Sequence, residues 1–276
     1  MYLISVPSPY YSIKSAISVL SFDSSNHDLL LTVLWDGVVH TSGQVRASAA
    51  RLFELLVKGV SESLVSSRVF PALVTLGNDP EISVRTSTIP ALGAIIENVT
   101  VREMLDRAYM QFLTFMDDPA YRDEHRVHVE LIHTLARVGP NTEPKFREEF
   151  ILPRLAAMAL ANNHVTDDKR KREIALELFE AYSSMSCCVM SDQLVRETML
   201  PGLRCLQQDM IQIAPEHDEV IQSMIKDYET KMELSRSDRS SSFGQLGNTS
   251  GSDDMKSRVM SKFKDTNLSN IFTRKK

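Results

Sequence analysis

Residues 69–93 have the sequence VFPALVTLGNDPEISVRTSTIPALG, and this stretch contains three distinct local patterns. Pro71 stands near the start of an apolar run, an Asp-Pro pair follows at Asp79-Pro80, and Val84-Arg85 precedes a second apolar run. Apolar side chains in both runs recur three and four positions apart, which is the spacing that places them on one face of a helix. The stretch therefore predicts two amphipathic helices joined by a short polar turn.

The same patterns recur along the chain at a nearly constant spacing. The Asp-Pro pair returns 39 residues later, and the Val-Arg pair also occurs 39 residues earlier. The Pro-x-Leu pattern returns after 82 residues and again after a further 48. A two-helix unit with a period of about 40 residues is typical of HEAT and armadillo repeats. The positions that we expect to have a structural role in the repeat are Arg46, Pro71, Asp79, Pro80, Arg85, Asp118, Pro119, Pro153 and Pro201.

Each of these residue types has a mechanical reason to recur in a helical hairpin. Asp79 is suited to an N-cap, where its carboxylate accepts hydrogen bonds from the free N–H groups of the next helix. Pro80 is suited to the first helical position, where the N–H that proline lacks would have no partner. Arg85 lies about one and a half turns further on. It could reach the capping aspartate of a neighbouring hairpin, with Asp79 and Asp118 as candidates, and so fix the rotation between hairpins.

Helical periodicity covers most of residues 28–228, and no segment of similar length alternates with a period of two. In the fourth repeat, Lys171-Arg172 stands near the place where Val-Arg stands elsewhere. The predicted hairpins span residues 28–58, 61–98, 101–139, 146–184 and 191–232. The large apolar residues expected between them are Leu52, Phe53, Leu73, Leu76, Leu92, Ile95, Phe112, Phe115, Leu131, Leu155 and Phe179.

The two ends of the chain depart from this period. Residues 1–26 predict an irregular N-terminal segment with one helix from Ile13 to Phe22. Residues 27–232 form the predicted solenoid. Residues 233–276 begin with a Ser-rich linker that cannot bury a core, and they end in a short basic amphipathic tail. The predicted fold is therefore all-α: an α-solenoid of about five HEAT-like hairpins with a disordered C-terminal tail.

Charge and cysteine usage narrow the classes of function. Residues 229–276 carry ten basic and six acidic side chains, which leaves a net charge of −9 on residues 1–228. Nucleic-acid binding needs a positive surface, so we expect no nucleic-acid partner. Cys187, Cys188 and Cys205 are too few for a disulfide framework. We expect them to be reduced thiols in helix cores, in a reducing compartment.

The sequence nominates no catalytic, metal-binding or cofactor-binding residue. It contains no P-loop, no Gly-x-Gly-x-x-Gly and no Gly-x-Ser-x-Gly. His125, His128 and His133 cannot converge from one helix, and their spacing is not that of a metalloprotease. No apolar run reaches the roughly 20 residues that a membrane-spanning helix needs. We therefore expect a protein that is not an enzyme, with no cofactor, whose membrane contact is indirect or peripheral.

Several longer stretches of the sequence identify a family more specifically than any repeat consensus does. From about Leu29 to Asp209, roughly two-thirds of the chain, the sequence resembles the C-terminal HEAT region of the RELCH family, whose members combine LisH, coiled-coil and HEAT-repeat parts. The stretches that carry the resemblance are Leu31–Trp35, Gln44–Arg51, Pro71–Leu76, Arg137–Asn141, Leu178–Ser183, Ser186–Cys188, Leu200–Leu206 and the closing Phe272–Lys276.

The resemblance implies a non-catalytic scaffold in membrane traffic. Proteins of this family bind a small Rab GTPase of recycling endosomes and an oxysterol-binding lipid-transfer protein, and they promote cholesterol movement to the trans-Golgi network. It implies a cytoplasmic protein, peripheral to those two compartments. This chain has no LisH motif and no coiled coil, so dimerisation would use parts that it does not contain. The family pattern names no partner-binding residue in this chain.

Two other interpretations compete with this one. HEAT repeats also build phosphatase regulatory subunits and cargo carriers, and recovery of such partners from a cell extract would favour a scaffold of that kind. An enzyme could also have an all-α fold, in which case a pocket with converging titratable groups would reveal it.

Overall fold

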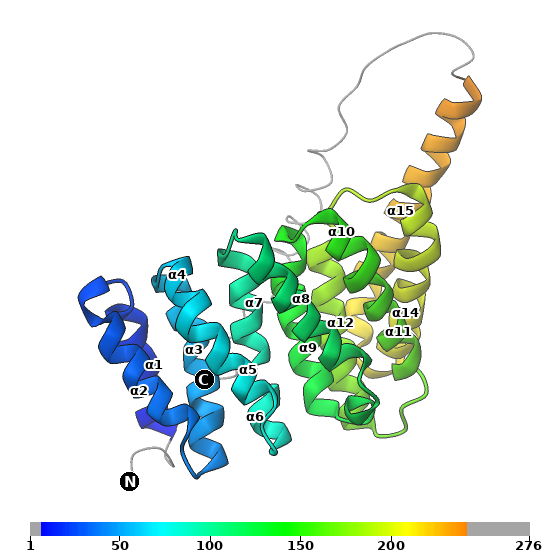
Figure 1. Ribbon diagram of the computed structural model, residues 1–276. Helices are drawn as coiled ribbons and strands as arrows, with labels where there is room; N and C mark the ends of the chain where they lie inside the picture. Colours follow the sequence, from blue (N-terminus) through cyan, green and yellow to red (C-terminus); the bar gives the residue numbers. More distant parts are fainter. Residues whose placement is uncertain (1–6, 242–276) are drawn as a thin grey trace. The chain divides into compact units, whose positions relative to one another are not determined.

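A computed structural model describes residues 7–241 of the protein, with side chains described for residues 11–234 (Figure 1). Within that part of the chain every regular element is helical and no strand occurs, which confirms the all-α prediction. The chain divides after Pro144 into two compact units, and each is described by itself. No helix among the described residues combines the length and apolar character needed to cross a bilayer.

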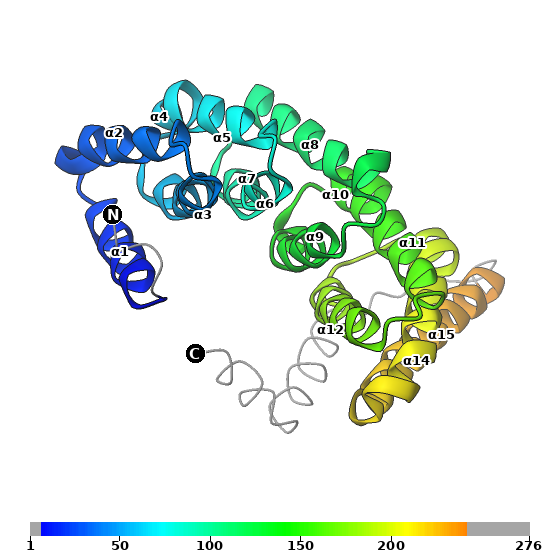
Figure 2. The ribbon, with the colours of Figure 1, turned by 90° about the horizontal axis from the view of Figure 1, so that it is seen from below.

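The first unit contains helix α1 followed by three hairpins. Figure 2 shows α2, α5 and α8 side by side in an outer row, with α3, α7 and α9 in an inner row. In chain order the elements of this unit are α1 (Pro7–Leu20), η1 (Ser24–Asn26), α2 (His27–Val38), α3 (Gly43–Gly59), α4 (Glu62–Leu64), η2 (Val65–Val69), α5 (Phe70–Gly77), α6 (Ile82–Thr86), α7 (Ile89–Asn98), α8 (Arg102–Asp117), η3 (Pro119–Tyr121), α9 (His125–Val138) and η4 (Gly139–Asn141).

The second unit contains two hairpins. Helix α11 packs against α12 and α14, and α14 packs in turn against α12 and α15. The elements are α10 (Pro144–Phe146), η5 (Arg147–Ile151), α11 (Leu152–Asn162), α12 (Asp168–Met185), α13 (Asp192–Leu194), η6 (Val195–Met199), α14 (Leu200–Ile213), η7 (Pro215–His217) and α15 (Asp218–Ser241).

The five predicted hairpins are confirmed, and most of their boundaries agree within two or three residues. The eleven apolar residues expected between hairpins are all buried, with exposed fractions of 6% or less. Burying a side chain of this size contributes about 1.5–3 kcal/mol, so contact between neighbouring helices is the main source of stability in each unit.

Both ends of the helical region are longer than expected. Helix α1 begins at Pro7, where we expected an irregular segment with a helix only from Ile13; prolines in the first turn of a helix cost no hydrogen bond. Helix α15 continues to Ser241, past the expected end at residue 232. The predicted amphipathic tail, residues 255–264, lies outside the described residues.

Three helical segments contain a π-helical turn directly before a recurring proline. The N–H of Phe70 donates to the carbonyl of Val65, five residues back, and the same bond joins Leu152 to Arg147 and Leu200 to Val195. A proline ring collides with the carbonyl four residues before it in a regular helix. The wider π turn makes room for the ring. This explains how the recurring prolines lie inside long helical segments: Pro71, Pro153 and Pro201.

Close packing between two inner helices of the first unit depends on Gly93. A Cβ atom at this position of α7 would collide with the Cγ2 atom of Thr134 and would lie 2.8 Å from the Nη2 atom of Arg137, both on α9. Thr134 is buried and β-branched, so its methyl group has little room to move. The missing side chain therefore sets the distance between α7 and α9.

We expect Gly93→Ala to lower the free energy of unfolding by about 1–3 kcal/mol, because it overpacks this contact. Gly77→Ala is the matched control, since the nearest side-chain atom to its new methyl group would be the amide nitrogen of Gln111, 3.3 Å away. The control should change stability by less than about 1 kcal/mol. Urea unfolding of both variants measures the difference, and equal stabilities would contradict the role given to Gly93.

Candidate protein-binding surfaces

In each of the first four hairpins, the inner helix has a basic residue at its fourth position. In the second hairpin the inner helix is broken, and the position is counted from the start of its first segment, α6. These residues are Arg46 in α3, Arg85 in α6, His128 in α9 and Lys171 in α12. Three of them donate to carbonyl oxygens of the loop before their helix: Arg46 to His40, Arg85 to Asp79, and Lys171 to Asn163. His128 has the equivalent contact with the backbone of Tyr121. Each basic residue therefore ties the loop of its own hairpin to the start of the inner helix.

Arg46 also joins the first hairpin to the second. Its Nε donates to Oδ2 of Asp79 at 2.7 Å, and its Nη2 donates to Oδ1 at 2.9 Å, so the two groups form a bidentate pair. Asp79 is 8% exposed. Hydrogen bonds from Arg46 hold the pKa of the Asp79 carboxyl below its ordinary value. This is the contact between neighbouring repeats that the sequence suggested, but Arg46 makes it and not Arg85.

Arg85 reaches the third hairpin by a different contact. Its Nε donates to the hydroxyl of Tyr121 at 2.9 Å, and its guanidinium lies 5.5 Å from the centre of the Tyr121 ring. No pattern in the sequence pointed to this tyrosine, because only aspartates recur in the motif. The expectation that Arg85 would reach the side chain of Asp79 or Asp118 was wrong, since the loop carbonyls of Asp79 and Pro80 occupy its Nη1.

The two Asp-Pro pairs differ in their local roles. Asp79 is not an N-cap, because α6 begins three residues later at Ile82; its Oδ1 accepts from the N–H of Glu81 and closes a turn around Pro80. Asp118 does cap a short 3-10 turn in which Pro119 is the first residue, and its Oδ1 accepts from the N–H of Ala120. Only the second pair therefore has the geometry that the sequence predicted for both.

The second unit contains a buried polar cluster in the same place between hairpins. Nζ of Lys171 lies 3.1 Å from Oδ1 of Asp209, whose Oδ2 accepts from Nδ2 of Asn162 at 2.7 Å. Asp209 and Asn162 are almost fully buried. Lys171 therefore connects α12 to α14 as Arg46 connects its own hairpin to the next one. The sequence placed Lys171 near the Val-Arg position but did not identify Asp209.

Ion pairs cross the inner row of the first unit. Arg137 on α9 contacts Glu54 on α3 and lies 3.3 Å from Glu97 on α7. Arg51 on α3 pairs with Glu130 on α9 at 3.1 Å. These charged side chains therefore neutralise one another, and a charged partner that bound to them would first have to break existing pairs.

The outer row of the first unit has two surfaces that are open to solvent. Leu29, Val33 and Val39 are each more than half exposed at α2, and Trp35 is 40% exposed. A groove of about 440 Å³ lies between α5 and α8. Both features are suited to contacts with another protein. The residues that line the groove are Phe70, Val74, Glu103, Asp106, Arg107, Met110, Gln111 and Thr114.

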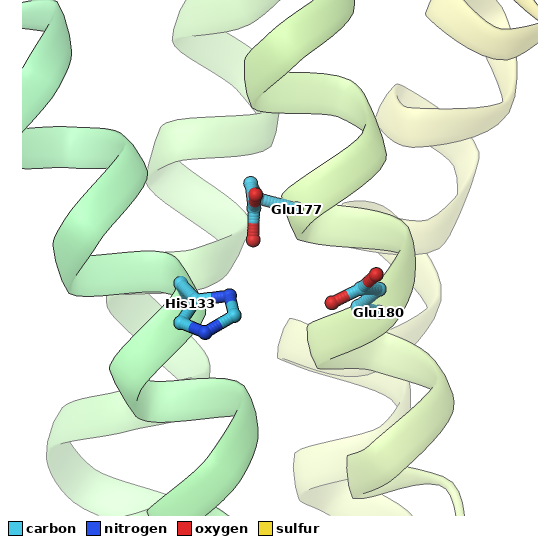
Figure 3. Close-up of side chains that lie close together, drawn as sticks. All are labelled: His133, Glu177 and Glu180. Carbon is cyan, nitrogen blue, oxygen red and sulfur yellow. The ribbon is translucent and has the colours of Figure 1, made fainter. Parts of the chain in front are cut away.

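The histidines that the sequence singled out differ in environment. Burial lowers the pKa of His128, so it is mainly neutral at pH 7, whereas His133 is exposed and His125 is half-buried. Figure 3 shows His133 on α9, with Glu177 and Glu180 on α12. Helix α9 belongs to the first unit and α12 to the second, so these side chains define no site within either unit.

The cysteines are free thiols in three settings. Cys187 is exposed and Cys188 is half-buried, and both follow the end of α12 at Met185, so the expectation of a helix-core position was wrong for these two cysteines. Burial raises the pKa of Cys188 to about 11, and burial also raises the pKa of Cys205. Both of these half-buried side chains therefore remain protonated at pH 7.

Seven consecutive charged residues, Asp167–Glu173, lie at the start of α12 and are explained by local structure. Asp167 caps the helix and accepts from the N–H groups of Lys169 and Arg170. Asp168 lies in the first turn, where a negative charge is favourable next to the helix dipole. Lys171 is used in the buried cluster. This run therefore needs no ligand to account for it.

Taken together, the hairpins, the basic residues at their inner helices and the paired charges define an α-solenoid of HEAT type, a class of protein whose members present long surfaces to other proteins. Residues 4–227 match the family described as the RAB11-binding protein RELCH C-terminal domain. The chain belongs to this family and corresponds to its C-terminal domain.

Three relatives show the extent of the similarity. The chain is 50% identical to the RAB11-binding protein RELCH homolog of Danio rerio, 49% to the RAB11-binding protein RELCH of Mus musculus and 47% to that of Homo sapiens. Each comparison covers 97% of this chain but only 22–23% of the relative. The chain therefore spans less than a quarter of the length of these proteins. No solved structure matches it.

We expect Arg46→Met to destabilise the first unit clearly at pH 7, because it leaves the buried Asp79 carboxylate unpaired. A carboxyl group with a lowered pKa contributes stability above its ordinary pKa, and the contribution is lost as pH falls through the lowered value. The stability difference from wild type should therefore narrow below about pH 4.

The matched control is Arg51→Met on the same helix, which removes an exposed pair and should change stability by about 0–1 kcal/mol at any pH. Urea unfolding between pH 3 and pH 7 measures both variants. A difference for Arg46→Met that does not vary with pH would contradict the importance of the Asp79 pair.

In the second unit, we expect Asp209→Ala to lower the free energy of unfolding by about 3–5 kcal/mol, because Lys171 and Asn162 would lose their shared partner inside the protein. Arg204→Ala on the same helix breaks only an exposed pair with Glu229 and should cost about 0–1 kcal/mol. Thermal and urea unfolding compare the two, and similar losses would show that the cluster has no special role.

Proposed function

We propose that this chain is a non-catalytic scaffold that binds a small GTPase of the RAB11 kind. The observation that carries the proposal is the family match over residues 4–227, together with 47–50% identity to three proteins named for RAB11 binding. The fold is consistent with it, because the stacked hairpins of each unit offer an extended surface on which a folded partner can bind.

Within each unit, the residues that connect hairpins are distinct from the exposed residues, and this distinction supports the same proposal. Arg46, Asp79, Lys171 and Asp209 are used between neighbouring hairpins and are mostly buried. We propose that these positions, with the recurring prolines, fix the rotation of one hairpin on the next and do not contact the partner. Partner contacts would then come from exposed side chains that have no such structural use.

A finer proposal concerns the cellular role. We propose that the chain acts at recycling endosomes and the trans-Golgi network, where the GTPase recruits it and a sterol-transfer protein of the oxysterol-binding kind is a second partner. In this role it would promote cholesterol distribution without entering the membrane. Dimerisation would depend on LisH and coiled-coil parts of a longer protein. These statements rest on resemblance to the RELCH family.

The alternative is a HEAT scaffold of another class, such as a phosphatase regulatory subunit or a cargo carrier. Affinity capture from cell extract separates the two: enrichment of Rab and sterol-transfer proteins favours the first, and enrichment of phosphatase or transport subunits favours the second. The 47–50% identity to RELCH proteins favours the first.

We expect the purified chain to bind RAB11 loaded with a non-hydrolysable GTP analogue at least about tenfold more tightly than RAB11 loaded with GDP, because the γ-phosphate orders the switch segments that effectors contact. Isothermal titration calorimetry measures both affinities. A Rab GTPase of an unrelated compartment serves as the control. Equal affinity for the two nucleotide states, or no binding to either, would overturn the proposed function.

A further inference from the structure

Two adjacent cysteines lie in a turn of the second unit. Helix α12 ends at Met185, and Cys187 and Cys188 follow it before α13 begins at Asp192. Cys187 is exposed, Cys188 is half-buried, and their side chains interact through a hydrogen bond. The two sulfur atoms are therefore close together, outside a regular helix, and one of them is open to solvent.

A buried arginine lies next to this pair. Arg147 is the first residue of the π turn η5, and the first residues of η2 and η6 are the buried valines Val65 and Val195. Arg147 is 7% exposed, and its Nε has no hydrogen-bond partner among the described residues. Its Nη2 lies 3.9 Å from Glu148, which is beyond hydrogen-bonding distance. Burying a guanidinium without a full set of partners is costly, so packing alone does not explain an arginine where the other repeats have valine.

The charge of Arg147 acts on Cys188. Burial raises the pKa of the Cys188 thiol to about 11, with smaller contributions from Cys187 and Glu148, and the guanidinium opposes this rise because it stabilises the thiolate. The hydroxyl of Tyr228 is buried, has no hydrogen-bond partner in the described part of the chain, and interacts electrostatically with both cysteines. The cysteine pair therefore lies beside two donor groups that can stabilise negative charge on sulfur or on an oxygen bound to it.

Adjacent thiols can bind a soft metal ion or become oxidised to a disulfide. No group of three potential metal ligands within the described residues includes either cysteine, and the positive charge of Arg147 disfavours a bound cation. The same charge favours oxidation, because the thiolate is the form of cysteine that reacts. The surroundings of Cys187 and Cys188 therefore support oxidation over metal binding.

We propose that Cys187 and Cys188 form a reversible redox site, which a hydroperoxide converts to a disulfide between the two adjacent residues. The Cys187 thiolate attacks one peroxide oxygen: an S–O bond forms, the O–O bond breaks, and the departing oxygen takes up the proton that Cys187 lost. The Cys188 thiolate then attacks the Cys187 sulfur: the S–S bond forms, the S–O bond breaks, and the departing hydroxide takes up the proton from Cys188. Both thiols are oxidised, and the hydroperoxide is reduced to an alcohol and water.

The adjacency of the residues makes the second step efficient and the product easy to reduce. Cys188 is next to the oxidised sulfur, so its high effective concentration compensates for its small thiolate fraction. Cα atoms across a trans peptide are about 3.8 Å apart, whereas disulfides usually join Cα atoms at least about 4.4 Å apart. Strained disulfides of this kind are labile and regulatory. Closing the bond would also remove the hydrogen bond from Cys187 to the carbonyl of Ser184, and so change the turn after α12.

The test treats the full 276-residue chain with hydrogen peroxide, blocks the remaining thiols with N-ethylmaleimide and analyses the peptides by mass spectrometry. We expect the peptide that contains Cys187 and Cys188 to carry an internal disulfide and no label, and treatment with glutathione to restore labelling. Cys205, half-buried on α14, is the internal control and should be labelled before and after oxidation. Sulfinic or sulfonic acid at Cys187 as the main product, or a disulfide between two chains, would overturn the proposal.

Two variants test the part that Arg147 plays. Arg147→Val places at this position the residue that η2 and η6 have there, so we expect the fold to be kept, and the melting temperature verifies this. Without the charge, condensation with Cys188 should be slower, and the Cys187 sulfenic acid trapped with dimedone should increase several-fold. Arg196→Val removes an exposed arginine of η6 and should leave the trapped amount as in wild type. Equal amounts in the three proteins would overturn the role assigned to Arg147.

Discussion

Burial of one helical hairpin against the next is the constraint on which the rest of this structure depends. A single hairpin cannot cover its own apolar side, so each one is stable only where a neighbour supplies the opposing surface. Large residues such as Phe112 and Leu131 are fully buried in these contacts. These contacts are apolar and have little directional preference. They explain why hairpins stack, but by themselves they do not determine the rotation of one hairpin relative to the next.

We propose that polar contacts fix that rotation. The pair between Arg46 and Asp79 has two donors and two acceptors in a defined arrangement, which favours one orientation of the first hairpin on the second. In the second unit, Lys171 and Asp209 connect neighbouring hairpins with different side chains. The chemistry differs, but in both places a basic residue in the first turn of an inner helix meets an acidic residue of the following hairpin.

The sequence predicted the fold because hairpin stacking uses patterns that recur. Apolar spacing, the Val-Arg pair and the Pro-x-Leu pattern predicted five hairpins and their core. The sequence did not predict contacts that follow no recurring pattern. These are the contact of Arg85 with Tyr121 and the contact of Lys171 with Asp209. It also could not predict the π turns, because the wider turn is a response of the backbone to the proline and leaves no separate mark in the sequence.

The same reasoning explains why a scaffold surface is harder to recognise than an active site. Catalysis requires particular groups at particular distances, whereas binding to a folded partner requires only an area that is apolar, accessible and suitably charged. The structural residues of this protein are identified by their buried pairs. The exposed apolar side chains of α1 and α2, by contrast, are interleaved with polar ones. Apolar side chains that are exposed among polar ones are normal at a protein surface, so their exposure alone does not identify the surface that a partner uses.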